Sequence, residues 1–331
     1  MERNWIAIQN DDFHRSVDEH LSRLKNTFDE RGIYETLSAL IFNGKRVRAE
    51  LIYALADRSS KKQIDSLALD AAVIELVHLS TLIHDDIIDE ARIRRGAPTL
   101  NSVYSVEIAL LAGNIIKDEA LNLAPDSSKK IFNDASLDVN RGQLLETIAS
   151  GYPVLSTLDY FKVVLFKSVM MFIHCARIAN NYRKDCIGEK EFRSLALVAF
   201  SYQIVDDWID LTKTEMFAGK NTGRDMANEV KSFFTSSPDG KETIILNRPD
   251  NIHRRILEDI WHIYTEIIPG TRLFDRSINI NLFPVDGRLI SKFLKKLREA
   301  SLSLVNNPDV EEIVLRFFNY LESDVADSSD G

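Results

Sequence analysis

The sequence predicts an all-α protein, a large bundle of helices around a central cavity. Proline, which breaks helices, is absent from residues 1–97 and again from 154–237. Apolar residues recur mostly at every third or fourth position, the helical period, whereas the alternation typical of β-strands is weak. The glycines are sparse and stand where helices are expected to end. Together these observations favour a chain that is helical nearly throughout.

The individual helices follow from this periodicity and from local start and stop signals. Ser156 is a candidate N-cap, and Pro308 suits the first turn of the last helix. In chain order, helices are expected at 11–30, 33–43, 46–58, 64–88, 99–123, 127–149, 157–181, 189–213, 251–267, 287–306 and 309–323.

The remaining segments are expected to be loops and chain ends. Residues 214–250 are the least regular part, with several glycines and prolines, and should form loops with a short helix near 226–234. Loops beside a site often carry ligand contacts. The chain, 1–331, is expected to be a single domain with frayed ends at about 1–10 and 324–331.

Composition limits the classes of function. Hydrophobic residues make up 45% of the 331 residues, enough for a large core, and 27% are charged. The net charge of −9 argues against a general nucleic-acid-binding protein, whose phosphate contacts need a basic surface. Two cysteines, Cys175 and Cys186, are too few for a disulfide scaffold, so a reduced, cytoplasmic setting is expected. A signal peptide is not expected, because the first residues lack a basic region followed by an apolar run. A transmembrane segment is not expected either, because no stretch reaches about 18 uninterrupted apolar residues, and Lys167 interrupts the nearest candidate at 163–173.

One segment combines an apolar helix with a cluster of acids. Residues 71–88 are largely apolar but carry Asp85 and Asp86 near their end, and Asp89 follows. A helix that is apolar nearly all round is expected to be buried. With about 100° per residue, its polar positions fall on one stripe, which should face a cavity. This stripe consists of His78, Thr81, Asp85 and Asp89.

The same acidic spacing returns at Asp206, Asp207 and Asp210 on a second apolar helix. Each cluster is unfavourable by itself, because like charges repel and buried carboxylates cost free energy unless they are paired or bind metal. Mg²⁺ removes the penalty, since it prefers oxygen ligands and is often bound by carboxylates together with substrate phosphates. A solvated acidic face would explain one cluster. Two clusters on apolar helices instead predict carboxylates that face each other across a cavity and bind metal for a diphosphate.

These two motifs resemble those of the trans-type prenyl diphosphate synthases, which are class I isoprenoid synthases. The resemblance covers roughly residues 30–235 and implies the isoprenoid synthase fold. It also implies Mg²⁺, about three ions per active site, as the cofactor, and a homodimer. The matching segments are Asp85-Asp86-x-x-Asp89 followed by Arg94-Arg95-Gly96, and Tyr202-Gln203-x-x-Asp206-Asp207-x-x-Asp210.

The resemblance assigns roles to basic and polar residues as well. Isopentenyl diphosphate would be bound by Lys45, Arg48, His78 and Arg95, and the allylic diphosphate by Arg94, Lys167, Ser168 and Lys220, with Tyr202 and Gln203 in the same substrate-binding set. The expected catalytic residues are Asp85, Asp89, Arg94, Lys167, Gln203, Asp206 and Lys220. Taken without the resemblance, the same cations suit an exposed basic turn and a lysine that reaches to solvent, and His78 suits a hydrogen-bonded core position.

Some positions depart from the family pattern. Asn114, Ala199 and Val230 replace residues that are usual there, which puts the rate and the substrate preference in question. Ala49 replaces a usual proline, which affects backbone stiffness rather than ligation. The reaction implied is ionisation of an allylic diphosphate, farnesyl or geranylgeranyl, followed by attack of isopentenyl diphosphate. Small side chains at Ser80 and Thr81, before the first cluster, imply a long product, beyond C20. Contact with a membrane surface is expected when such a product is released.

Three other functions fit parts of the sequence. A terpene synthase or an irregular prenyltransferase on the same fold would not need isopentenyl diphosphate, and the retained Lys45 and Arg48 argue against it. A regulatory subunit of a heteromeric synthase fits the departures after residue 225 but not the intact acidic clusters. Glu75-x-x-His78 also suggests a di-iron bundle, but a second such pair is missing.

Overall fold

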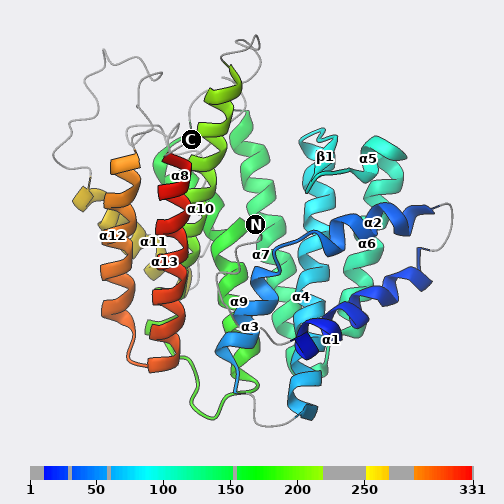
Figure 1. Ribbon diagram of the computed structural model, residues 1–331, viewed down its shortest axis with the longest axis horizontal. Coiled ribbons are helices and arrows are strands. Elements are labelled where there is room, and N and C mark those ends of the chain that lie inside the picture. Colours follow the sequence, from blue (N-terminus) through cyan, green and yellow to red (C-terminus); the bar gives the residue numbers. More distant parts are fainter. Residues whose placement is uncertain are drawn as a thin grey trace. The chain divides into compact units, whose positions relative to one another are not determined.

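The computed structural model describes residues 11–28, 32–57, 61–151, 155–218, 251–267 and 287–329. These residues are helical apart from one short hairpin and connecting turns, which confirms the predicted all-α class (Figure 1). The chain divides into two compact units. The first comprises residues 1–140 and 171–187, and the second comprises 141–170 and 188–331.

The first unit is built around one long helix, α4 (Lys61–Ile88), which packs against α1, α3 and α6. Almost every side chain of α4 from Leu67 to Ile83 is buried, as its apolar composition predicts. The surrounding elements are α1 (Asp11–Ser22), the 3₁₀ turn η1 (Arg23–Asn26), α2 (Ile33–Phe42), α3 (Val47–Leu55), α5 (Leu100–Val103), α6 (Val106–Leu123), the start of α7 (Asp126–Ser150) and α9 (Met170–Asn180).

By length and composition alone, α4 could cross a membrane. However, 78% of its most apolar window is buried inside the protein, and core helices of soluble proteins pass the same test. Its apolar surface is therefore explained by packing against the neighbouring helices.

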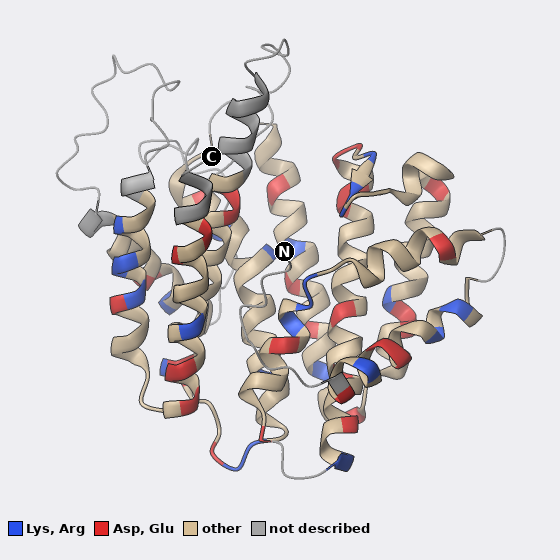
Figure 2. Ribbon diagram, viewed as in Figure 1, with Lys and Arg blue, Asp and Glu red and all other residues tan. Residues whose placement is uncertain are grey.

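A small β-hairpin follows α4, where the sequence pattern predicts only a connecting loop. Strands β1 (Ile93–Arg94) and β2 (Ala97–Pro98) pair antiparallel, with Arg95 and Gly96 at the turn. Both turn residues have positive φ, 53° and 75°, as a type I′ turn requires. Figure 2 shows both signs of charge at this hairpin and the adjoining end of α4.

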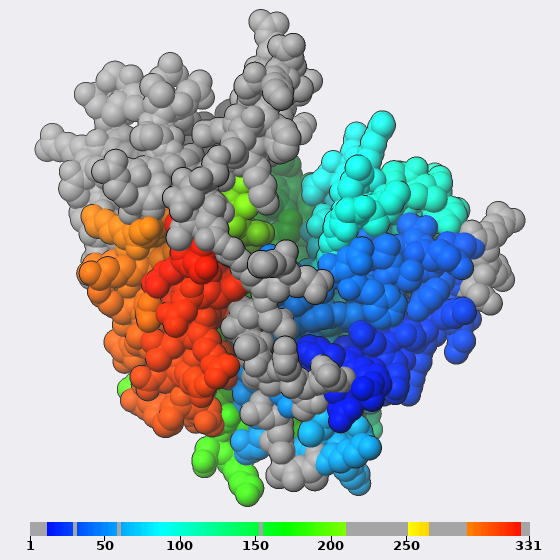
Figure 3. Space-filling view, in the orientation of Figure 1, coloured from blue at the N-terminus to red at the C-terminus, as the bar shows by residue number. Residues whose placement is uncertain are grey.

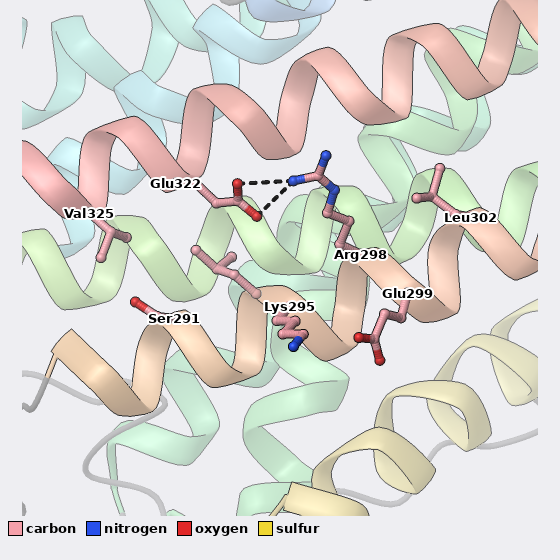
Figure 4. Close-up of a pocket in the computed structure, with 8 residues that line it drawn as sticks. Ser291, Lys295, Arg298, Glu299, Leu302, Glu322 and Val325 are labelled. Atoms are coloured by element: carbon pink, nitrogen blue, oxygen red, sulfur yellow. Dashed lines mark hydrogen bonds and ion pairs between the residues drawn. The ribbon is translucent and has the colours of Figure 1, made fainter.

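The second unit is organised around α10 (Glu189–Ala218), which packs against α11 (Asn251–Ile267), α12 (Gly287–Leu304) and α13 (Pro308–Ser329). The helices α12 and α13 pack as an antiparallel pair (Figure 1), and their atoms adjoin on the surface (Figure 3). An open groove of about 520 Å³ lies along this pair, where both carboxylate oxygens of Glu322 lie 3.0 Å from Arg298 Nη1 (Figure 4).

Aromatic packing fixes α8 (Thr157–Val164) within the second unit. The ring of Phe161 contacts Phe200 of α10 at 5.2 Å and Tyr264 of α11 at 5.5 Å between centroids. Ser156 caps α8, since its Oγ accepts a hydrogen bond from the Asp159 amide. This confirms the N-cap that the sequence predicted.

Several predicted helices differ from the structure at breaks and ends. The helix expected at 99–123 is interrupted at Tyr104, because Ser105 caps α6 through a hydrogen bond from the Ile108 amide. The helix expected at 157–181 contains a π-helical turn, η3 (Leu165–Val169), between α8 and α9. The last helix continues to Ser329 rather than ending at 323. The short helix expected at 226–234 lies outside the described residues.

Candidate active site

The first acidic cluster lies on the last turn of α4. Asp85 and Asp86 are buried, with 8% and 1% of their surface exposed, whereas Asp89 is exposed. The helix ends in a Schellman motif, in which the amides of Glu90 and Ala91 donate to the carbonyls of Ile87 and Asp86. Glu90 adopts a φ of 51° at the position where glycine is usual. The carboxylates therefore lie on a tightly closed helix end.

Asp86 is held by residues of the following hairpin. Its Oδ1 lies 2.5 Å from Arg94 Nε, and its carbonyl accepts a hydrogen bond from Asn101 Nδ2 at 3.1 Å. Burial raises the pKa of the Asp86 carboxyl, and the bond from Arg94 opposes part of that rise. The structure thus places Arg94 directly on the first cluster.

Arg95, the next residue, lines a cavity of the first unit. Its Nη1 donates to the Leu40 carbonyl at 2.6 Å. A Cβ at Gly44 would lie 2.6 Å from the same nitrogen, so a larger residue there would displace the Arg95 guanidinium from its present position. The cavity is small, about 10 Å³, with space for roughly one water. It is lined by Leu21, Leu40, Ile41, Arg46, Glu75, Leu76, His78, Leu79 and Arg95.

His78 is surrounded by cations, as its predicted partners imply. Its pKa is lowered well below the usual value, first by burial and then by Arg48, Arg95 and Arg94. His78 is therefore neutral near pH 7. Arg48 is half-buried and Lys45 is exposed, on the segment that leads into α3.

Two buried glutamates accompany this cationic group, and neither belongs to the predicted set of site residues. Glu75 Oε1 accepts a hydrogen bond from the Ala49 amide at 3.2 Å. Burial lowers the pKa of Arg95, and the charge of Glu75 opposes part of that lowering. Glu50 is 5% exposed, and burial followed by the charge of Glu75 raises its pKa to about 8. The spacing Glu75-x-x-His78 draws attention to Glu75, one helical turn before His78 on the same face of α4, but only as part of a di-iron alternative.

Ser80 and Thr81 are buried on α4, one turn before the first cluster. Ser80 Oγ donates to the Val77 carbonyl at 2.8 Å, and Thr81 Oγ1 donates to the His78 carbonyl at 2.7 Å. Both hydroxyls are satisfied by their own helix. The side-chain surfaces that Ser80 and Thr81 present to neighbouring groups are therefore small and largely apolar.

The second acidic cluster lies on α10 in a network of side-chain hydrogen bonds. Asp207 Oδ1 accepts from Gln203 Nε2, and Asp207 Oδ2 accepts from the hydroxyl of Tyr160, both at 2.7 Å. Gln203 Oε1 in turn accepts from Ser168 Oγ at 2.7 Å. Asp206 is exposed, while Asp207 is half-buried.

A cavity of about 100 Å³ adjoins this network within the second unit. Lys167, on the π-helical turn, pairs there with Glu146 of α7. A Cβ at Gly142 would lie 2.5 Å from the backbone nitrogen of Lys167, so glycine allows α7 to approach this turn closely. Single π turns inside helices occur often at functional sites. The cavity is lined by Glu146, Ala149, Leu155, Tyr160, Val163, Val164, Lys167, Ser168, Gln203 and Asp207.

The structure brings the predicted residues together in two groups, one in each unit. The first unit holds Lys45, Arg48, His78, Ser80, Thr81, Asp85, Asp86, Asp89, Arg94 and Arg95, and the second holds Lys167, Ser168, Tyr202, Gln203, Asp206 and Asp207. Tyr202 packs its ring on Phe317 of α13, at 5.9 Å between centroids. Lys220 and the side chain of Asp210 lie outside the described residues.

The donor set suits a hard cation, because both clusters offer carboxylate oxygens. In the described parts of the chain, no three His, Cys, Asp or Glu side chains are grouped so that they alone could hold a metal ion. This arrangement fits Mg²⁺, which commonly takes one or two carboxylates and completes its shell with water and substrate phosphates. Both cysteines are free thiols, Cys175 buried and Cys186 exposed.

The polyprenyl synthetase family model matches residues 30–237, and the chain belongs to this family. The chain is 32% identical over 197 residues to the nonaprenyl diphosphate synthase of Mycobacterium tuberculosis, a match that covers 57% of this chain and 59% of the relative. It is 28% identical over 257 residues to the short chain isoprenyl diphosphate synthase of Methanocaldococcus jannaschii, covering 74% and 73%. The match thus spans little more than half of the first relative's length.

Solved structures confirm the fold over nearly the full chain. Geranylgeranyl pyrophosphate synthetase from Pyrococcus horikoshii superposes with a TM-score of 0.65 at 21% identity, covering 94% of this chain and 96% of that one. The polyprenyl synthase from Caulobacter crescentus, complexed with calcium and isoprenyl diphosphate, gives 0.54 at 18% identity, covering 93% and 97%. At these identities the likeness establishes the isoprenoid synthase fold alone.

Proposed function

We propose that the chain condenses isopentenyl diphosphate with an allylic prenyl diphosphate, farnesyl or geranylgeranyl, and releases diphosphate. The observation that carries this proposal is the pair of adjacent arginines on the hairpin after α4. Arg94 binds the first acidic cluster, whereas Arg95 lies in the cavity that holds His78 and Glu75. One turn thereby supplies a cation to two neighbouring sites, as a reaction between two diphosphates requires.

Isopentenyl diphosphate would be bound by the cationic group around His78. Arginine forks match phosphate oxygens, and Lys45 adds a mobile point charge. Neutral His78 can donate one ring N–H to the diphosphate. Glu75 would hold Arg95 in place until the anion arrives, and the side chains lining the small cavity would separate to admit it.

The allylic diphosphate would be bound at the acidic clusters. Asp85, Asp86 and Asp89 together with Asp206, Asp207 and Asp210 would hold Mg²⁺, which neutralises charge on the leaving diphosphate when bound. Arg94, Lys167 and Lys220 would add positive charge at the same diphosphate, with Ser168, Tyr202 and Gln203 beside them. The C–O bond of the allylic substrate breaks, and the double bond of isopentenyl diphosphate attacks the carbon so exposed. The released diphosphate can accept the proton that is then lost.

We infer a product longer than C20 from the small side chains at Ser80 and Thr81. Their hydroxyls are bonded to the backbone of α4, so a growing hydrocarbon would meet little volume and no free donor there. The relatives include both a nonaprenyl and a short chain synthase, so the length rests on these residues alone.

We further propose that the enzyme is a cytoplasmic homodimer that contacts membranes when it releases its product. Helix α6 supports the dimer, because Val106, Leu110, Leu111 and Ile115 expose 52%, 47%, 59% and 40% of their surfaces. Large apolar side chains exposed together on one helix commonly mark an interface. A second copy of the chain would cover this face of α6 with the same face of its own α6.

The function can be tested with the purified full-length chain, Mg²⁺, isopentenyl diphosphate and either geranyl, farnesyl or geranylgeranyl diphosphate. Mass spectrometry should detect all-trans prenyl diphosphates longer by C5 units. The variant D85A should abolish elongation, whereas D118A, which changes an exposed aspartate of α6, should not. Hydrocarbon products without consumption of isopentenyl diphosphate would instead identify a terpene synthase. No turnover with any primer would favour a regulatory subunit.

A further inference from the structure

Asp207, in the second acidic cluster, is bonded at both carboxylate oxygens by protein donors. Gln203 reaches Oδ1 from one helical turn earlier on α10, and Tyr160 reaches Oδ2 from α8. Both distances are 2.7 Å, within the range of bonds to charged acceptors. The orientation of this carboxylate is therefore set by two different helices.

Tyr160 is itself rigidly placed. It is 3% exposed, and it lies in the first turns of α8, where Ser156 caps the helix. The neighbouring Phe161 anchors α8 to α10 and α11, and Asp159 pairs with Lys162 in a buried ion pair at 3.2 Å. A side chain held this firmly loses little conformational entropy when it donates a hydrogen bond.

The hydrogen bonds form one continuous chain across the cavity wall. Ser168 donates to Gln203, Gln203 donates to Asp207, and Tyr160 donates to the other oxygen of Asp207. Gln203 is oriented at both ends of its amide, so it cannot turn without breaking one of these bonds. Loss of the Tyr160 hydroxyl would remove the donor to Asp207 Oδ2 and would leave the carboxylate oriented less tightly, through the Gln203 bond to Oδ1.

We propose that Tyr160 is a positioning residue for the second acidic cluster. Its hydroxyl orients Asp207, and Gln203 through Asp207, for binding of a magnesium–diphosphate complex. The inference rests on the proposed function, because that function assigns the cluster to metal and diphosphate. Tyr160 acts through Asp207 and lies beside it on the cavity wall. Residues that orient metal ligands in this way typically change metal affinity by about 10–100-fold when they are replaced.

The test compares Tyr160→Phe with a matched control, Tyr182→Phe. Tyr182 donates to Asp70 at the same distance of 2.7 Å, in a buried network that includes Ser128 and no residue of either cluster. Binding of inorganic pyrophosphate to the full-length protein is measured by calorimetry at increasing Mg²⁺. The Mg²⁺ concentration for half-maximal binding should rise about tenfold or more in Y160F. In Y182F it should change by less than about twofold, whatever the loss of stability.

A double-mutant cycle separates positioning from general packing. In the Asp207→Ala background, adding Y160F should cause no further change in the Mg²⁺ requirement, because the acceptor is already absent. A further shift as large as in the wild type would overturn the inference, as would equal Mg²⁺ requirements for Y160F and wild type. Failure of the wild type to bind pyrophosphate with Mg²⁺ would overturn the proposed function, and this inference with it. Binding by the wild type combined with an unaffected Y160F would overturn the inference alone.

Discussion

The guanidinium of Arg94 lies 2.5 Å from the carboxylate of Asp86, Nε to Oδ1, and ties the β-hairpin to the last turn of α4. The Asp86 side chain is 2% exposed and that of Arg94 is 28% exposed. A carboxylate buried to this extent is costly unless it is paired. The ion pair therefore stabilises the fold at the place where the first acidic cluster is presented.

Replacing Arg94 with Ala should lower the free energy of unfolding by about 1–3 kcal/mol, because Asp86 would lose its charged partner. Urea unfolding followed by circular dichroism, in the presence of a chelator, measures this loss without bound metal. The control is R92A, which removes an exposed arginine two residues earlier. Equal losses in the two variants would mean that the ion pair contributes nothing specific.

Replacing Ser80 with Phe should shorten the products, because a large ring would fill space beside the first cluster. Mass spectrometry of the prenyl products with farnesyl diphosphate as primer reports the length. Ser66→Phe is the control, since Ser66 lies on the same helix and bonds its own backbone, but is exposed. A folded S80F protein with an unchanged product distribution would show that chain length is set elsewhere.

Stability should fall as the pH rises through neutrality because of Glu50. Burial, followed by the charge of Glu75, raises the pKa of Glu50 from 4.5 to about 8. A group whose pKa is higher in the folded protein takes up protons on folding. Its contribution to the free energy of unfolding is therefore complete below pH 4.5 and is lost as the pH rises towards 8.

The variant E50Q keeps this position neutral and should remove that pH dependence. Relative to E50Q, the wild type should lose about 2–4 kcal/mol of unfolding free energy between pH 4.5 and 8. Urea titrations at several pH values measure the difference, with Glu35→Gln as an exposed control on α2. A constant difference between wild type and E50Q across this range would contradict the prediction.

Charges placed on the exposed face of α6 should dissociate the proposed dimer. The double variant L110E/L111E would bury two carboxylates in an apolar interface, a cost that the interface cannot offset. Light scattering coupled to size-exclusion chromatography should then give the mass of one chain. Arg15→Glu, an exposed charge change on α1, should leave the mass unaltered. A wild-type protein that already elutes as a monomer would refute the dimer itself.

Local sequence signals predicted most of the helical architecture. The helix at 251–267 has the predicted bounds, and both Ser156 and Pro308 begin helices as their side chains and backbone preferences suggest. The hairpin after α4 was missed, because strands of two residues are too short to show alternation. Its one local signal was the Arg95-Gly96 pair, which suits a turn with positive φ at both positions.

By itself the sequence determined which residue types the two clusters offer, and it predicted a cation between them, because carboxylates repeated at fixed spacing on apolar helices are costly without one. It did not show how the members of each cluster differ. Only the tertiary structure decided that Asp86 pairs with Arg94, and that Asp207 is bonded by Tyr160, 47 residues away in the chain. Helical spacing specifies the face on which a side chain lies, whereas the partner that reaches it depends on how separate elements pack.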